Sequence, residues 1–311
     1  MGAPDSCQAS TLNPSRAWNC SQDAGCPIRG QPDRSPALPW SALAPPLASI
    51  ARLFRHDISI RSRLRPPVVN LREVFSGAAL VIVAAGRGTR FGGFKQLTPI
   101  GGESLLKRTM SAFDELPFAQ RIVVLPRELH ANAALLRDLS GARYMWKFVE
   151  GGDERVDSVK AGIAAMDSKL EFVAVHDGAR PFPPLEATWR CMAELAAQPI
   201  LAGAIVAAPV TDTLKRVDKR GGIVETIPRG EVRRAETPQI VRRDLILDAF
   251  ARTHAEPPTD EAQALERAGH LVVAFTHDEI NLKITTTNDI AIAEALLNRR
   301  PNLMRPEIET R

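Results

Sequence analysis

From Gly77 onward the chain alternates short apolar runs with stretches of helical periodicity, and this alternation restricts its fold more than any other feature. The apolar runs have the length and the Val, Ile and Ala content of strands, and they lie at residues 79–85, 121–125, 171–176, 201–209, 271–275 and 281–286. Between them we expect helices over residues 103–116, 127–139, 153–166, 185–197 and 288–297. Continuous apolar strands that alternate with helices are typical of a mainly parallel sheet covered on both faces.

This pattern predicts a single α/β domain over residues 76–311, with a Rossmann-like twisted sheet and helices on both of its faces. In such sheets, ligands bind at the carboxyl ends of the strands. One stretch, TDTLKRVDKRGGIVETI (residues 211–227), breaks the alternation and reads as two short polar strands around a KRGG turn. A hairpin this hydrophilic is unsuited to a core, so we expect a projecting β-hairpin arm at about residues 210–230.

Residues 1–75 differ in composition from the rest of the chain. They contain ten of the 24 prolines, and their nine Arg, no Lys and five acidic residues give a net charge of +4. We predict that they form a disordered, basic, Pro-rich N-terminal extension. Residues 76–311 contain 31 basic and 31 acidic side chains, so the charge pattern does not favour a nucleic-acid partner. No apolar run approaches the roughly 20 residues of a membrane helix, and we expect no membrane association.

Cysteine usage bears on the compartment in which the protein works. Three of the four cysteines lie in residues 1–75, and the sequence has neither a metal-type CxxC pair nor a disulfide framework. A reduced compartment fits this pattern best, and we expect a cytoplasmic protein. Because the extension is rich in Arg and poor in acidic residues, plastid-type targeting is the less favoured alternative.

A glycine-rich stretch, AAGRGTRFGGFKQ (residues 84–96), directly follows the first predicted strand. Its backbone amides suit a phosphate. It is not a dinucleotide fingerprint, because Phe91 stands where the third glycine is needed, and it is not a Walker loop, because Lys95 comes one position late. Instead it adds two cations, Arg90 and Lys95. Fixed cations stabilise the charge that develops on a phosphorus under attack more than they stabilise the ground state, so the loop predicts a reaction at a phosphate.

This loop resembles the signature of the nucleotidylyltransferases that activate sugar or polyol phosphates. Six further motifs follow it in order: GGDERVDSVKAG (151–162), VHDGARPF (175–182), APVTDTLKRV (208–217), AETPQ (235–239), TDEAQALE (259–266) and NLKITTTNDIAIAE (281–294). Together they resemble the 2-C-methyl-D-erythritol 4-phosphate cytidylyltransferase family of the non-mevalonate isoprenoid pathway, over about residues 77–300. The resemblance implies a nucleotidyltransferase that moves a cytidylyl group from CTP to 2-C-methyl-D-erythritol 4-phosphate. The products would be 4-diphosphocytidyl-2-C-methyl-D-erythritol and pyrophosphate.

On the nucleotide side, the resemblance implies that Arg90 and Lys95 stabilise the transition state, and it gives Arg229 and Lys283 a catalytic role as well. The loop backbone would wrap the triphosphate and the base. The implied CTP-binding residues are Ala84, Ala85, Gly86, Gly88, Lys95, Asp153, Ser158 and Asp177. The residues alone leave a second interpretation of Asp153 open, because an acidic residue at this position could simply cap the helix that follows.

On the acceptor side, the implied residues for the polyol phosphate are Asp177, Arg180, Thr213, Arg229, Thr237 and Lys283. A Lys in a buried strand is costly unless it is paired, and Asp278 is the partner that we expect for Lys283. Glu236 departs from the family pattern, in which an uncharged residue more often precedes the Thr of this motif. His176 is interpreted as structural, because a phosphate monoester is already ionised near pH 7 and needs no base. The motif at 259–266 is interpreted mainly as a helix cap with an acidic first turn.

The family pattern also implies a partner and a metal. The arm would exchange across a two-fold axis and complete the neighbouring site, so we expect a homodimer. Mg²⁺ or another divalent cation would be held mainly by the CTP phosphates, with Asp177 as a candidate ligand. Two alternatives stay open: a cytidylyltransferase for ribitol 5-phosphate or a related polyol phosphate, and a non-catalytic nucleotide-binding protein. The sequence HDGARP favours the methylerythritol enzyme over the first, and the presence of Arg90, Lys95 and Lys283 argues against the second.

Overall fold

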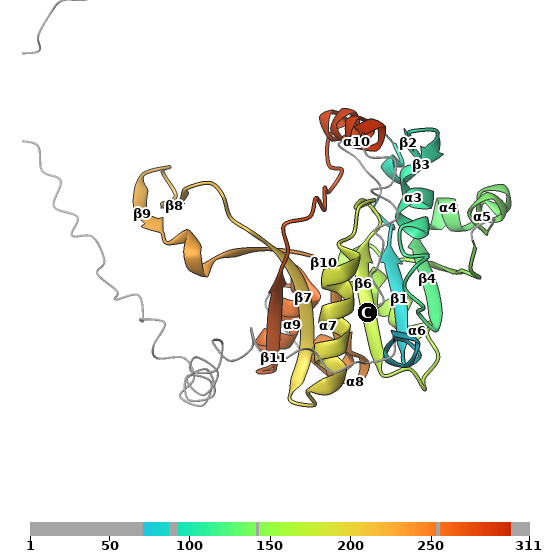
Figure 1. Cartoon of the computed structure of the whole chain (residues 1–311), viewed down its shortest axis with the longest axis horizontal. Helices are drawn as coiled ribbons and strands as arrows, with labels where there is room; N and C mark the ends of the chain where they lie inside the picture. The colour runs from blue at the N-terminus through green and yellow to red at the C-terminus, as the bar shows by residue number, and fades with distance from the viewer. Residues whose placement is uncertain (1–70, 87–92, 141–142, 253–255, 300–311) are drawn as a thin grey trace, which may run out of the picture. The chain divides into compact units, whose positions relative to one another are not determined.

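A computed structural model of the chain describes residues 71–86, 93–140, 143–252 and 256–299. The chain divides after Arg65, and all the described residues belong to the unit that follows. Their main feature is a seven-stranded sheet with the order β11-β7-β10-β6-β1-β4-β5 (Figure 1). Its strands are β1 (Ala78–Val83), β4 (Gln120–Leu125), β5 (Lys147–Glu150), β6 (Phe172–Asp177), β7 (Leu201–Pro209), β10 (Arg233–Arg242) and β11 (Leu271–Thr276). Only the two pairs that contain β10 are antiparallel, so the predicted mainly parallel sheet is confirmed.

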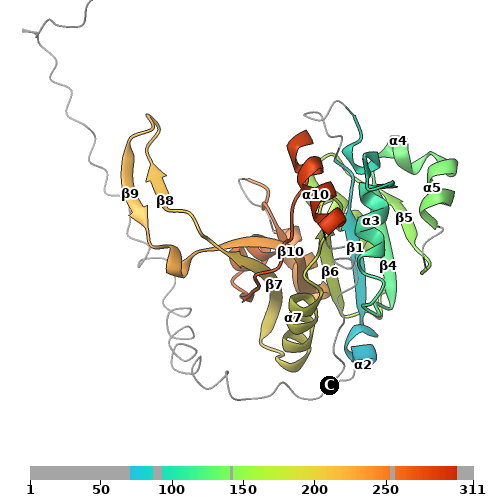
Figure 2. The same cartoon turned by 45° about the horizontal axis from the view of Figure 1, so that its top comes forward.

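Helices cover both faces of this sheet, as predicted (Figures 1 and 2). Leu80 and Ile82 of β1 pack on one face with residues of α2, α3, α5 and α7, whereas Ala79 and Val81 pack on the other with residues of α6, α8 and α9. The helices are α2 (Leu71–Phe75), α3 (Leu105–Ser111), α4 (Arg127–His130), α5 (Ala133–Ser140), α6 (Arg155–Ala164), α7 (Leu185–Ala197), α8 (Arg243–Ala251), α9 (Glu261–Arg267) and α10 (Thr287–Arg299). Short elements complete the fold: η3 (Lys95–Leu97), β2 (Pro99–Ile100), β3 (Glu103–Ser104) and η4 (Arg229–Glu231).

Helix α6 lies so close to β1 that a glycine is needed between them. A Cβ atom on Gly162 would lie 2.4 Å from Cγ1 of Val81 and 3.1 Å from Cγ2 of Val124. Such distances are far below van der Waals contact, so any larger residue would push the helix off the sheet. This close packing fixes the start of α6 beside the carboxyl end of β1, where the predicted ligand site lies.

The polar stretch at 211–227 forms the predicted hairpin. Its strands are β8 (Leu214–Val217) and β9 (Ile223–Ile227), and they pair only with each other. In the turn, Oδ1 of Asp218 accepts hydrogen bonds from the amides of Arg220 and Gly222, both at 2.8 Å, and Gly221 adopts a φ of +83°. The hairpin stands away from the sheet in both views (Figures 1 and 2).

Two sequence predictions about elements were wrong or incomplete. Residues 281–286, predicted as a strand, lie outside the sheet; Leu282 and Ile284 belong instead to a hydrophobic cluster with residues of α10 and Ile100 of β2. Strands β5 and β10 and helix α8 were not predicted. The first six residues of β10 include three charged residues and Pro238, so it lacks the apolar run that marks the other strands.

The N-terminal boundary also differs from the prediction. Residues 71–75 were assigned to the disordered extension, but they form α2, and Phe75 packs edge-on against Phe118 with ring centroids 4.7 Å apart. A five-residue helix is too short to show periodicity in the sequence. The remainder of the predicted extension lies outside the described residues. No helix in the described part of the chain is long and apolar enough to cross a membrane.

Candidate active site

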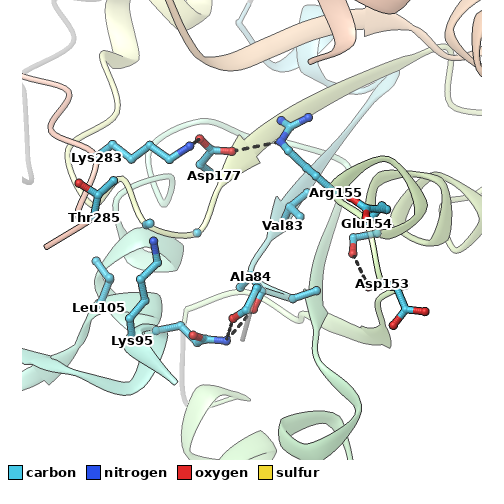
Figure 3. A pocket seen from close by; sticks show the side chains of 17 residues that line it. Val83, Ala84, Lys95, Leu105, Asp153, Glu154, Arg155, Asp177, Lys283 and Thr285 are labelled. Atoms are coloured by element: carbon cyan, nitrogen blue, oxygen red, sulfur yellow. Dashed lines mark hydrogen bonds and ion pairs between the residues drawn. The ribbon is translucent and has the colours of Figure 1, made fainter. Parts of the chain in front are cut away.

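A cavity of about 460 Å³ lies where the carboxyl ends of β1 and β6 meet, as the sheet topology predicts (Figure 3). The register pairs Val83 at the end of β1 with Asp177 at the end of β6. The cavity is lined by the residues after β1, the start of α6, the turn after β6 and the extended segment after β11. Of the predicted site residues, those that line it are Ala84, Ala85, Gly86, Lys95, Asp153, Ser158, Asp177 and Lys283.

The carboxylate of Asp177 is surrounded by three cations. Its Oδ2 atom lies 2.8 Å from Nζ of Lys283 and 3.5 Å from Nε of Arg180, and its Oδ1 atom lies 3.6 Å from Nε of Arg155. Burial alone would raise the pKa of Asp177, but Arg155, Lys283 and Arg180 together hold it well below its usual range. Asp177 is therefore ionised at neutral pH, and the cations outnumber it. The predicted pairing of Lys283 with Asp278 was wrong, because the segment after β11 turns Lys283 toward the end of β6.

Arg155 is a cavity residue that sequence reasoning missed. Its guanidinium makes a two-pronged salt bridge with Glu261 at the start of α9, with Nη1–Oε1 and Nη2–Oε2 distances of 2.7 and 3.0 Å. Burial lowers the pKa of Arg155, but Glu261 and Asp177 more than offset this and raise it. The sequence feature that could have identified Arg155 is its position as the first residue of α6, directly after the GGDE turn. Asp260 caps α9 as interpreted, since its Oδ1 accepts from the Gln263 amide at 2.8 Å, but Glu261 supports the cavity wall.

The described ends of the glycine-rich loop are held on both sides of the cavity. Nε2 of Gln96 donates to the carbonyl oxygens of Ala84 and Gly86, at 2.8 and 3.2 Å, and so fixes the turn after β1. Nζ of Lys95 donates to the carbonyl oxygen of Ile284 at 2.9 Å, on the same segment as Lys283. Arg90 and Gly88 lie outside the described residues, so their predicted roles stay predictions.

The start of α6 borders both this cavity and a second one of about 510 Å³, which shares Ala85, Gly86, Gly152 and Asp153 with it. A Cβ on Gly151 would lie 2.5 Å from Cβ of Ala85, so the close approach of these two segments requires a glycine at position 151. Asp153 is exposed, and Glu154, not Asp153, occupies the N-cap position of α6. The capping interpretation of Asp153 was therefore wrong, and its carboxylate is free to face a ligand in either cavity.

On the acceptor side, Thr237 and Arg180 lie behind Asp177 and do not line the cavity. The buried Thr237 hydroxyl accepts a hydrogen bond from the Asp177 amide at 3.1 Å and contacts Nδ1 of His176 at 3.1 Å. Nη1 of Arg180 donates to the carbonyl oxygen of Asn281 at 2.7 Å. Burial lowers the pKa of His176 to about 4. These contacts agree with a structural role for His176, and they show that Thr237 supports Asp177.

Arg229 and Thr213 are not brought to the cavity of their own chain. Both are exposed and lie at the base of the β8–β9 hairpin, where Arg229 donates to the carbonyl oxygen of Thr211. The hairpin stands away from the sheet, on the side opposite to β4 and β5 (Figure 2).

The electrostatics of the cavity indicate its chemistry. Lys95, Lys283, Arg155 and Arg180 lie at or directly behind its wall. Asp177 and Glu261 are the carboxylates paired with the last three, and Asp153 and Glu154 are two further carboxylates of the lining, so the cations are concentrated around Asp177 and the lining as a whole is formally neutral. A cluster of three cations around one carboxylate, beside a glycine-rich turn, suits an anion with several charges, such as a triphosphate. The arrangement can position phosphates and offset the charge that develops during transfer.

Comparisons with known proteins agree with this chemistry. Residues 78–299 match the family model described as "IspD: 2-C-methyl-D-erythritol 4-phosphate cytidylyltransferase". A cytidylyltransferase of that name from Symbiobacterium thermophilum is 36% identical, with 70% of this chain and 92% of the relative covered. A bifunctional IspD/IspF enzyme from Rhodospirillum rubrum is 41% identical over 70% of this chain, which spans 56% of that longer protein.

Solved structures support the same assignment. The crystal structure of 4-diphosphocytidyl-2C-methyl-D-erythritol synthase from Anaerococcus prevotii has a TM-score of 0.62 and 27% identity, with 71% of this chain and 98% of that chain covered. The match includes the sheet and the segments that form the cavity, because the family model runs from the start of β1 to the end of α10. The chain therefore belongs to the 2-C-methyl-D-erythritol 4-phosphate cytidylyltransferase family.

Proposed function

We propose that this protein transfers a cytidylyl group from CTP to 2-C-methyl-D-erythritol 4-phosphate in isoprenoid precursor synthesis. The observation that carries the proposal is the cluster of three cations around Asp177 in the cavity, at the carboxyl end of the sheet beside the glycine-rich turn. Family membership over most of the domain supports the choice of nucleotide and acceptor.

In the proposed reaction, the triphosphate of CTP lies between the turn after β1 and the start of α6, with the base toward Asp153 and the second cavity. The acceptor phosphate lies near Lys283, in line with the α-phosphorus. One of its oxygens attacks, a new P–O bond forms, and the bond to pyrophosphate breaks. No base is needed, because the attacking phosphate is ionised at neutral pH. This fits a buried, neutral His176 that takes no part.

In this mechanism, positively charged side chains stabilise the negative charge of the phosphates. Lys95 and Arg90 would offset the charge on the phosphorus, and Lys283 would hold the acceptor phosphate. Lys283 is paired with Asp177, which keeps the Lys283 ammonium group at the cavity while 44% of the side chain is exposed. Positioning of two reactants can supply about 7–11 kcal/mol of the barrier reduction in well-oriented cases.

We also propose a divalent cation, with Mg²⁺ as the first choice. The described residues contain no cluster of three or more His, Cys, Asp or Glu side chains that could hold a metal by themselves. A nucleotide-bound Mg²⁺ needs only one or two protein carboxylates, however, and Asp177 offers one at the cavity. Mg²⁺, when bound, supplies neutralisation of phosphate charge and helps pyrophosphate to leave.

A homodimer with exchanged arms is the proposed active unit. The hairpin exposes Val217, Ile223 and Val224 to 55%, 67% and 62%, and burial of these side chains would favour contact with a second chain. Arg229 and Thr213 would then reach the partner's cavity. Because CTP is an intracellular metabolite, we propose that the enzyme works in the cytoplasm.

Mixing two inactive variants tests the shared site. If Arg229 serves the partner's cavity, a heterodimer of Arg229→Ala and Lys283→Ala chains contains one intact site, because both lesions fall in the other site. Random mixing should then restore about a quarter of wild-type activity. No recovery, with heterodimers shown by sedimentation or native mass spectrometry, would place both residues in the same site and contradict arm exchange.

A further inference from the structure

Glu236 and His277 form a buried pair that the proposed mechanism does not use. Oε2 of Glu236 lies 3.3 Å from Nε2 of His277, and their side chains are 6% and 4% exposed. Neither residue lines the cavity. Glu236 is also the residue singled out from the sequence as unlike the family pattern.

The pair holds a charge inside the protein. Although burial alone would raise the pKa of Glu236, the contact with His277 and the charges of Arg180 and Arg234 outweigh it and lower that pKa. Nη2 of Arg234 donates a hydrogen bond to Oε1 of Glu236 at 3.1 Å, but the Arg234 side chain is 66% exposed to solvent. Among the described residues, Oε2 of Glu236 has no hydrogen-bond partner. His277 is therefore the closest buried group that compensates this oxygen.

The pair joins the two segments that form the acceptor side of the site. Glu236 precedes Thr237 on β10, and the Thr237 hydroxyl accepts from the Asp177 amide. His277 follows β11, where its amide donates to the carbonyl oxygen of Ala207 at 3.0 Å, and begins the segment that leads to Lys283. The segments meet again at Asn281, whose Nδ2 donates to the carbonyl oxygen of Thr237 at 2.9 Å.

We infer that the Glu236–His277 pair is a positioning device that fixes the Lys283 segment against β10 and so sets the place of the acceptor phosphate. Two cross-links, one through the pair and one through Asn281, hold the segment before it turns Lys283 toward Asp177. Without the first, Asn281 is the cross-link that still ties residues 277–283 to β10, and the segment gains freedom near Lys283. The inference rests on the proposed cytidylyl transfer, because that transfer gives Lys283 its acceptor.

The chemistry of a buried carboxylate makes the pair testable. Removal of His277 alone leaves the Glu236 charge without its closest buried compensating group, which is more costly than removal of both groups. His277→Leu should therefore be the most damaging variant, and Glu236→Gln/His277→Leu should recover part of the loss. His277→Gln keeps a side-chain donor and should stay close to the wild type. Asp248→Asn, which breaks the exposed Asp248–Arg252 pair on α8, is the matched control.

The kinetic experiment uses the full chain and measures pyrophosphate release with CTP and the acceptor. We expect KM for the polyol phosphate to rise about tenfold in His277→Leu, to return to within about threefold in the double variant, and to change less than about twofold in His277→Gln. The dissociation constant of CTP should change less than about twofold throughout. A uniform loss of all kinetic parameters, or no loss, would overturn the inference.

Hydrogen exchange provides a readout that does not depend on turnover. The Ile284 amide donates to the carbonyl oxygen of Ala179 at 2.8 Å and reports on the segment directly. Its exchange should accelerate about tenfold in His277→Leu and recover in His277→Gln, while exchange in β1 is unchanged. Equal acceleration throughout the domain would indicate a structural role only. If the wild type shows no turnover but this local effect is present, the proposed function fails and the positioning role stands; if His277→Leu does not fold, the double variant and His277→Gln carry the comparison.

Discussion

Replacement of Glu261 by Gln tests whether the cavity wall depends on its buried salt bridge. Glu261 is 1% exposed and accepts two hydrogen bonds from Arg155, at 2.7 and 3.0 Å. Gln has nearly the same shape, but it carries no charge and offers one acceptor where the carboxylate offers two. Its amide NH₂ group would face an N–H group of the guanidinium, so one hydrogen bond would become a contact between two donors.

The size of the effect follows from these contacts. A hydrogen bond to a charged group contributes about 1.5–3 kcal/mol, and removal of one partner of a fully buried pair costs about 3–5 kcal/mol. Because the Arg155 side chain is 29% exposed, water can solvate part of its charge, and the expected loss is nearer to about 2–3 kcal/mol. For a domain of this size, that corresponds to a Tm lowered by about 4–12 °C.

Urea unfolding at neutral pH, followed by circular dichroism, measures the free energy of unfolding of both proteins. The Arg127–Glu150 pair is the matched control, because its Nε–Oε1 distance of 2.8 Å lies within the range of the Arg155–Glu261 contacts but its side chains are 80% and 41% exposed. Glu150→Gln should cost less than about 1 kcal/mol. Equal losses in the two variants would refute the reasoning, because they would show that burial adds nothing to the Arg155–Glu261 pair.

Three other variants test further parts of the account. Lys283→Ala should lower kcat/KM by about 10²–10³ with little change in Tm, and a loss below tenfold would contradict its role at the acceptor. The pKa of His176 falls from about 6.5 in the unfolded chain to about 4 in the fold. Between pH 6.5 and pH 4 the unfolded chain binds a proton at His176 and the folded protein does not. The free energy of unfolding should therefore fall by about 3 kcal/mol as the pH falls through this range. His176→Gln should flatten this part of the pH dependence of unfolding, and an unchanged slope would contradict the assignment. Gly162→Ala should cost about 1–3 kcal/mol in urea unfolding, and a neutral result would show that α6 can move away from Val81.

The sequence predicted the fold from apolar runs and helical periodicity, and it succeeded where a strand is buried on both faces, as in β1, β6 and β7. It missed β10, because an antiparallel strand that carries Glu236 and Pro238 has no continuous apolar run. It misassigned residues 281–286, because the alternation of Leu282 and Ile284 reports burial against α10 as readily as burial in a sheet.

The site was predicted in the same uneven way. Asp177 was found because it directly follows an apolar run, Lys95 because it is a cation in the glycine-rich loop, and Lys283 because it is a charged residue inside an apolar run. Arg155 was missed because its partner Glu261 is 106 residues away in the sequence, and a local sequence pattern cannot predict a contact between residues so far apart. Thr237 was expected to contact the acceptor, but only the fold shows that its hydroxyl is already engaged by the Asp177 amide.

Pyrophosphate release with CTP and one polyol phosphate at a time tests the central claim most directly. The account predicts turnover with 2-C-methyl-D-erythritol 4-phosphate, a CDP-linked alcohol as the product detected by mass spectrometry, and little turnover with ribitol 5-phosphate. Turnover with ribitol 5-phosphate alone would show that the acceptor has been misassigned. No turnover with either acceptor, from folded protein with Mg²⁺ present, would contradict the claim that the Asp177 cavity is a cytidylyltransferase site.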